Sequence, residues 1–272
     1  MRKFKYIAAF VIGFTCLTTQ SFAADPNTPP DFQTTIQQAD QGVAGAQFNL
    51  GLMYYKGLNV PQDYFKAVEY YKKAADQGVA EAQYNLGIMY DKGQGVPQDY
   101  FKAFEYYKKA ADQGNVNAQS NLGVMYDNGH GVPQNDAKAF EYYKKAADQG
   151  NAKAQLNLGV MYDNGQGVPQ NKAKAIEYYK KAADQGNAKA QSNLGIMYDK
   201  GQGVPQDYFK AVEYYKKAAD QGYAQAQFSL GNMYYKGQGI PQNQSQAKAY
   251  YKQACLNKSQ KGCDLYKMLN QE

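Results

Sequence analysis

Residues suited to catalysis or metal binding are scarce in this chain of 272 residues. The single histidine, His130, lies in a Gly-His-Gly turn where most corresponding turns carry glutamine, and we interpret it as a neutral substitution. A zinc site needs several His, Cys or carboxylate ligands close together, whereas His130 is far along the chain from Cys255 and Cys263. The sequence therefore predicts neither an enzyme nor a cofactor or metal site.

Glycine-rich turns such as Gly93-Gln94-Gly95 have the composition of a phosphate-binding loop but not its context. Such a loop follows a strand and leads into Gly-Lys-Ser or Gly-Lys-Thr. Here the turns follow a helical pattern and end in a proline such as Pro97. We interpret them as turns between helices.

Two kinds of polar residue recur in register along the chain and form our candidate partner-binding face. A column of carboxylates could bind a cation or a basic ligand, or it could be a solvated set near helix ends. A column of asparagines, beside apolar and aromatic residues such as Tyr84, could hold an extended peptide by its backbone amides. The carboxylates are Asp91, Asp127, Asp163 and Asp199, and the asparagines are Asn49, Asn85, Asn121, Asn157 and Asn193.

The elements that position these residues are repeats of 36 residues. We expect an N-terminal capping helix at 31–43 and a C-terminal capping helix at 260–272. The six repeats between them cover residues 44–79, 80–115, 116–151, 152–187, 188–223 and 224–259. We number positions from 1 at the first residue of each repeat.

Residues 80–115 illustrate the two helices of one repeat. Apolar residues recur at helical spacing over 80–90 and predict helix A, which Gly93 ends because glycine adopts the left-handed conformation of a helix terminus. Helix B begins near Asp99, an N-cap candidate, and runs to Gly114, its expected C-cap. One such hairpin cannot bury its apolar face alone, so neighbouring hairpins must stack into an all-α solenoid.

The central repeats read close to AxAQxNLGxMYDxGQGVPQxxxKAxEYYKKAADQGN. This pattern resembles the Sel1-like repeat, a relative of the tetratricopeptide repeat. The resemblance implies a right-handed superhelix whose concave wall is lined mainly by the A helices. It also implies a scaffold for protein–protein contacts, as in signalling proteins and in exported bacterial proteins that meet host cells.

The two cysteines near the C-terminal end are candidates for a disulfide. Cys255 replaces the second alanine of the KKAAD motif, and Cys263 follows eight residues later, where the preceding repeat has Gln227. This spacing is similar to that of cysteine-rich Sel1-like proteins, in which each hairpin junction is linked. We therefore expect a disulfide at the last junction, the alternative being two free thiols.

Comparison of the copies separates variable from fixed positions of helix A. Positions 2, 5, 9 and 12 vary, and spacings of three and four place them on one side of the helix. This side is one candidate for the binding groove. In the alternative, positions 5 and 9 contact the adjacent repeat and leave only positions 2, 6, 12 and 13 free.

Residues 1–23 have the pattern of a cleaved export signal. Three positive residues precede an apolar run over 7–17 that is too short for a membrane span, and small residues precede Ala24. A lipoprotein signal at Cys16 is the rival interpretation, on a poorer match. The positive residues are Arg2, Lys3 and Lys5.

Cleavage would leave residues 24–30 as a disordered leader and no membrane span. It would remove three positive charges and no negative ones, so that the net charge falls from +6 to +3. That balance is too small to favour nucleic acid as a partner. We expect a periplasmic or secreted protein.

The sequence thus favours an exported scaffold that binds a protein or peptide partner through the concave face. Cysteine-rich relatives suggest a second hypothesis, β-lactam binding or weak β-lactamase activity. A third hypothesis is peptidoglycan or glycan binding, which the 27 tyrosines favour but which packing would explain equally well.

Overall fold

The computed structural model of the protein describes residues 31–271, and within this range the chain forms fourteen α-helices and no strand. The prediction of an all-α solenoid is confirmed. A short helix comes first, α1 (Phe32–Asp40), and another comes last, α14 (Gln260–Met268). The A helices are α2 (Ala44–Lys56), α4 (Ala80–Lys92), α6 (Val116–Asn128), α8 (Ala152–Asn164), α10 (Ala188–Lys200) and α12 (Ala224–Lys236). The B helices are α3 (Tyr64–Asp76), α5 (Tyr100–Asp112), α7 (Asp136–Asp148), α9 (Lys172–Asp184), α11 (Tyr208–Asp220) and α13 (Gln244–Leu256).

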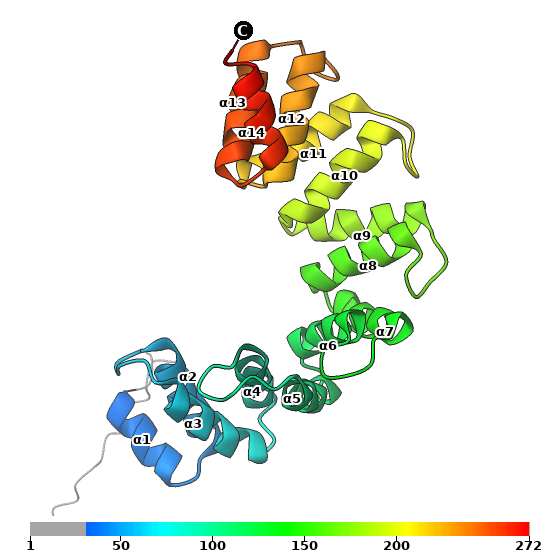
Figure 1. The fold of residues 1–272 in the computed structure, drawn as a ribbon. Helices are drawn as coiled ribbons and strands as arrows, with labels where there is room; N and C mark the ends of the chain where they lie inside the picture. Colours follow the sequence, from blue (N-terminus) through cyan, green and yellow to red (C-terminus); the bar gives the residue numbers. More distant parts are fainter. Residues whose placement is uncertain (1–30, 272) are drawn as a thin grey trace, which may run out of the picture.

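The helices follow one another along an open arc (Figure 1). Each helix packs mainly against the helices that precede and follow it in the chain. In addition α6 contacts α8, and α10 contacts α12, so these successive A helices touch across the intervening B helix. Figure 1 places α6 on the inner side of α7. The A helices therefore line the inner, concave face of the arc.

The turn between helix A and helix B depends on two glycines with a left-handed backbone. Gly165 ends α8 with φ 75°, as expected for a helix C-cap. Gly167 follows with φ 66°, and a Cβ there would lie 2.6 Å from the backbone oxygen of Asp136 in the preceding repeat. The first repeat has Asn59 at this position, with φ 60°. Asparagine tolerates this conformation better than most residues with a side chain.

Helix B starts at an acidic or amide N-cap in every repeat. The carboxylate of Asp99 accepts a hydrogen bond from the backbone N–H of Lys102 at 2.9 Å, as expected for an N-cap. The other end differs by one residue from our expectation. Helix α5 ends at Asp112 with Gln113 as its C-cap, and Gly114 comes one residue later with φ 89°. The reason is that Gln113 keeps a near-helical backbone, so the left-handed turn comes at the next residue.

A tyrosine at position 28 forms the centre of each helix pair, with its side chain almost fully buried. Its ring lies against the glycine at position 8 of helix A. A Cβ on Gly51 would lie 2.6 Å from Cδ1 of Tyr71, so only glycine lets the two helices approach so closely. These tyrosines are Tyr71, Tyr107, Tyr143, Tyr179, Tyr215 and Tyr251, each at most 1% exposed.

A buried glutamine at position 4 of each A helix joins three helices. The Nε2 of Gln155 donates to the backbone oxygen of Ala147 in the preceding helix at 3.3 Å. Its Oε1 accepts from Nε2 of Gln185, at the end of the following helix, at 2.8 Å. The sequence had not led us to expect this network. The equivalent glutamines are Gln47, Gln83, Gln119, Gln191 and Gln227, which make the same contact with the preceding helix.

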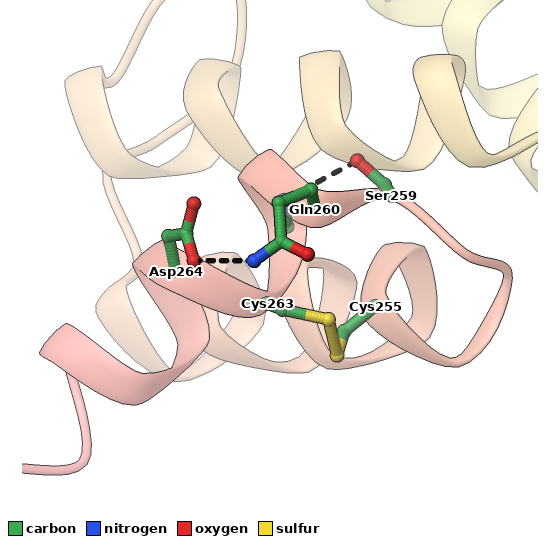
Figure 2. The surroundings of a disulfide bond; sticks show 6 residues. Cys255, Ser259, Gln260, Cys263 and Asp264 are labelled. Carbon is green, nitrogen blue, oxygen red and sulfur yellow. Dashed lines mark hydrogen bonds between the residues drawn. A yellow bond between two sulfur atoms is a disulfide. The ribbon is translucent and has the colours of Figure 1, made fainter.

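A disulfide between Cys255 and Cys263 joins α13 to α14, with Cα atoms 4.4 Å apart. Figure 2 shows the bond together with Ser259 at the start of α14. The Ser259 hydroxyl oxygen accepts a hydrogen bond from the backbone N–H of Gly262 and so caps this helix. A Cβ on Gly262 would lie 2.7 Å from Cβ of Ala254, so glycine permits the close contact between the two helices.

The predicted signal peptide and leader, residues 1–30, lie outside the described residues. In the part of the chain that is described, none of the helices has both the length and the apolar character that crossing a membrane requires.

Candidate functional site

The two predicted polar columns meet at the hydroxyl groups of the buried tyrosines. The hydroxyl of Tyr143 donates to Oδ2 of Asp127, in the same repeat, at 3.4 Å. Asn157, from the next repeat, is the other polar group at this hydroxyl. We call such a set an Asp-Tyr-Asn cluster. The other two complete clusters are Asp91-Tyr107-Asn121 and Asp163-Tyr179-Asn193.

Toward the two ends of the array the clusters are incomplete. Tyr71 has Asn85 beside its hydroxyl but Tyr55 in place of the aspartate. Tyr215 has Asp199 but Ser229 in place of the asparagine. The remaining candidate of the asparagine column, Asn49, is half-buried on α2. Complete clusters are therefore found in the middle of the array.

The clusters are electrostatically unusual because they are partly withdrawn from water. Burial raises the pKa values of Asp91, Asp127 and Asp199 above the usual aspartate value. Burial, followed by the nearby carboxylate, also raises the pKa of Tyr143, so its hydroxyl remains a hydrogen-bond donor at higher pH than that of a solvent-exposed tyrosine. In Asp127 the neighbouring carboxylate of Asp136 contributes to the raised pKa. A positive group placed beside these carboxylates would therefore be bound favourably.

Position 5 of helix A faces the packing between helices more than the surface. The ring of Tyr84 is half-buried against Tyr107, with centroids 5.9 Å apart. Position 9 is mixed, because Val124 is 37% exposed whereas Ile88, Val160 and Ile196 are partly buried and pack against the core. This geometry favours our second alternative for position 5 and, apart from Val124, for the apolar residues at position 9. In the central repeats, the buried residues at position 5 are Ser120, Leu156 and Ser192.

A hollow of about 260 Å³ lies beside the first complete cluster. His130 is at this hollow, with its ring stacked on that of Tyr100 at a centroid distance of 4.8 Å. The hydroxyl oxygen of Tyr107 is buried and makes no hydrogen bond of acceptable geometry within the described part of the chain. The hollow was not expected, because the sequence does not show which turn reaches which cluster. Its lining consists of Asp91, Tyr100, Tyr107, Asn121, Val124, Met125, Asn128 and His130.

The cluster of the fourth repeat differs because it contains its own cation. Nζ of Lys172, at position 21, forms an ion pair with Oδ1 of Asp163. The second repeat has Tyr100 at the same position, and the third has Asp136. In the fourth repeat, the residue at position 21 thus gives the aspartate of the cluster an ion-pair partner from its own repeat.

Catalytic arrangements are weakly represented in the described residues. A Ser-x-x-Lys spacing occurs once among them, at Ser245 and Lys248 on α13. Both residues line a hollow of about 280 Å³. Activation of a serine needs a hydrogen bond to its base, and among residues 31–271 none joins these two side chains. No three His, Cys, Asp or Glu residues of this range are grouped as a metal site would require.

The stacked helix pairs define a class of protein, the α-solenoids built from helical-hairpin repeats, whose long concave faces serve as binding surfaces. The Sel1 repeat model matches residues 44–79, 80–115, 116–151, 152–187, 188–223 and 224–259. The chain belongs to the Sel1 repeat family. Proteins of this family are generally non-catalytic scaffolds that bind protein partners.

Solved structures agree with this assignment. One is c5321, described as a protective antigen present in uropathogenic Escherichia coli strains, with 38% identity and a TM-score of 0.81. The match covers 85% of this chain and 49% of that chain, so our chain spans about half the length of that protein. A Sel1 repeat protein from Oxalobacter formigenes has 32% identity and a TM-score of 0.72, with 82% and 95% covered. No curated protein gives a significant match.

A third structure with a similar fold is described as an immunity protein. The immunity protein PA5088 from Pseudomonas aeruginosa has 25% identity and a TM-score of 0.52, over 80% of this chain and 82% of that chain. The solenoid fold is therefore shared with proteins described by different functional names.

Proposed function

We propose that this protein is an exported scaffold whose concave face binds an extended segment of a partner protein. The observation that carries the proposal is the row of half-buried Asp-Tyr-Asn clusters along the A helices. Each cluster contains a side-chain amide that is able to hydrogen-bond a peptide backbone. Each also contains a carboxylate, whose burial is unfavourable unless it has a hydrogen-bond donor or a positive partner. The row follows the arc, so a partner of extended shape would contact several repeats at once.

Photo-crosslinking tests the proposed binding face. A photoreactive phenylalanine analogue would replace Val124 on the inner face, and the matched control would carry it at Glu141, an exposed residue of helix B. We expect discrete protein adducts from the inner position only. Equal labelling at the two positions, or no adduct at either in cells that produce the protein, would contradict the proposal.

Export is the second part of the proposal. It is supported by the signal-like pattern of residues 1–23 and by the disulfide between Cys255 and Cys263, since such bonds persist in oxidising compartments. N-terminal sequencing of the protein recovered from fractionated cells should begin at Ala24, and the same fractions separate a periplasmic from a secreted protein. Recovery of an uncleaved chain from the cytoplasm would contradict export.

The two alternative functions have less support. Glycan binding was suggested by the tyrosines, but these rings are used within the fold. Tyr162 stacks on Tyr178 at 5.7 Å, and lysines lie over both rings, an arrangement that recurs along the array. For the β-lactam hypothesis, Ser245 and Lys248 are the residues to test. A nitrocefin assay with an active control enzyme would detect turnover by the protein and its loss in Ser245→Ala.

A further inference from the structure

The hollow beside Asp91 gathers hydrogen-bond acceptors around a buried tyrosine hydroxyl that makes no well-formed hydrogen bond. The half-buried carboxylate of Asp91, the hydroxyl oxygen of Tyr107 and the side-chain oxygen of Asn121 belong to residues that line it together. The hydroxyl oxygen is buried and makes no hydrogen bond within residues 31–271. A lysine ammonium has three donors and no acceptor, so its hydrogen-bonding capacity complements this set.

The fourth repeat shows which group satisfies such a carboxylate. Lys172 and Asp163 are both partly withdrawn from solvent, with side chains 33% and 25% exposed, and they form an ion pair. Asp163 is equivalent to Asp91, and Lys172 is equivalent to Tyr100. The chain therefore uses an ammonium at one cluster, whereas in the second repeat the equivalent carboxylate lies at a hollow that Tyr100 and His130 also line.

The remaining carboxylates of the column add negative charge to the inner face. Among the described residues, no lysine forms an ion pair with Asp91, Asp127 or Asp199. Asp136 adds a second carboxylate close to Asp127. Carboxylates without an ion-pair partner attract cationic segments and repel acidic ones during association, and at Asp91 the nearby His130 and Lys92 reduce this attraction in part.

The hollow also suits the rest of a lysine side chain. Its volume of about 260 Å³ is below the range of roughly 300–1,000 Å³ that drug-sized ligands occupy. Met125 and Val124 provide apolar surface for the methylene stem. Val124, Asn128 and His130 are exposed, so the hollow is reached from the protein surface.

We propose that the hollow between α4, α5 and α6 is a binding pocket for the ammonium group of a lysine on the partner protein. The inference rests on the proposed scaffold function and adds the chemistry of its partner, a segment with exposed lysine. Asp91 forms the ion pair, Asn121 and Tyr107 accept further hydrogen bonds, and the stem lies along Val124.

Exchanging the residues at position 21 of the second and fourth repeats tests the pocket twice, by filling it in one repeat and by opening it in the other. Tyr100→Lys should place the chain's own ammonium on Asp91, as Lys172 does on Asp163. Lys172→Tyr should leave Asp163 without its cation. The probes are the peptides acetyl-Gly-Lys-Gly-amide and acetyl-Gly-norleucine-Gly-amide, which differ in the charged ammonium. Binding is followed by amide chemical shifts in the NMR spectrum of the purified, oxidised protein.

In the unaltered protein we expect the lysine peptide, at millimolar concentration, to shift the side-chain amide signal of Asn121, and the norleucine peptide to leave it unchanged. Asp91→Asn should weaken this binding about 10- to 100-fold, because a hydrogen-bonded ion pair is lost. Tyr100→Lys should remove it. Lys172→Tyr should keep it and add shifts at Asn193. Circular dichroism establishes that each variant is folded.

Equal binding of the two peptides, no shift at Asn121, or full binding by a folded Asp91→Asn variant would overturn the lysine pocket. Photo-crosslinking keeps this result separate from the broader proposal. If Val124 still forms adducts when the peptide does not bind, the scaffold function holds and the pocket does not. If the peptide binds but no adduct forms in cells, the pocket stands and the proposed partner interaction fails.

Discussion

The central junctions of the solenoid and its last junction join equivalent helix segments in different ways, by hydrogen bonds in the centre and by a disulfide at the end. At the central junctions a glutamine such as Gln155 donates to the backbone of the preceding helix and accepts from Gln185 of the following one. At the last junction Cys263 stands at the glutamine position, and Cys255 stands where the accepting alanine is elsewhere. Among the described residues no helix follows α14 to supply the second hydrogen bond. A covalent bond thus replaces a network that would be half-satisfied there.

Removal of a central glutamine should have the largest effect. In Gln155→Ala the backbone oxygen of Ala147 and the amide of Gln185 lose their partner, and a small cavity remains. We expect the free energy of unfolding to fall by about 2–4 kcal/mol. Chemical denaturation followed by circular dichroism measures this change. Gln202→Ala, at an exposed loop residue, is the matched control and should stay within about 0.5 kcal/mol of the parent.

Loss of the disulfide should have a smaller and more local effect. In the double variant Cys255→Ala and Cys263→Ala, α14 should lose roughly 2 kcal/mol of stability, as expected for a short closed loop. Hydrogen exchange should accelerate in residues 260–268 and stay unchanged in α6 to α9. Faster exchange throughout the array would show that the last junction is coupled to the centre, contrary to the comparison.

A third variant asks whether the two kinds of junction are interchangeable. Cys255→Ala combined with Cys263→Gln rebuilds the glutamine contact at the last junction. We expect it to recover about 1 kcal/mol relative to the double alanine variant, because one hydrogen bond forms and the second donor is missing. Hydrogen exchange of α14 is the measurement. Full recovery to the stability of the disulfide-bonded protein would mean that the second hydrogen bond, which Gln185 donates at the central junction, adds nothing to the stability of such a junction.

The smallest expected effect concerns the caps of the A helices, which also differ between centre and ends. Asn151 caps α8 by accepting from the backbone N–H of Ala154 at 2.9 Å, whereas Val79 gives α4 no such bond. Asn151→Ala should therefore cost about 1 kcal/mol. Val79→Ala is the control and should change the denaturation midpoint less. An equal change in both variants would refute the role of the cap.

Local chemistry in the sequence was enough to predict the helices and their order. Gly93 and Asp99 mark helix ends because their residue types have intrinsic backbone or capping preferences. The glutamine network was not predicted, because its partners lie 8 and 30 residues apart, and periodicity does not show which residues meet across a junction. The C-cap was misplaced by one residue for a similar reason, since glycine marks the turn and not the last helical residue.

The candidate site was predictable only as separate columns. Asp127 and Asn157 were recognised from their recurrence, but their shared tyrosine hydroxyl comes from packing between consecutive repeats. His130 was interpreted as a neutral substitution, and the structure places its ring on that of Tyr100, at the hollow that Asp91 also lines. This position depends on a turn of one repeat reaching a helix of the preceding one, which no single repeat encodes.

Each Asp-Tyr-Asn cluster takes its asparagine from the repeat after the one that supplies its tyrosine. An excised single repeat would consequently hold no complete site, whereas duplicating a central repeat would add one. The number of complete clusters would then increase by one for each added repeat of 36 residues. A longer array could gain avidity for a multi-lysine partner without any new contact chemistry, provided that the spacing of the partner's lysines matches the added length.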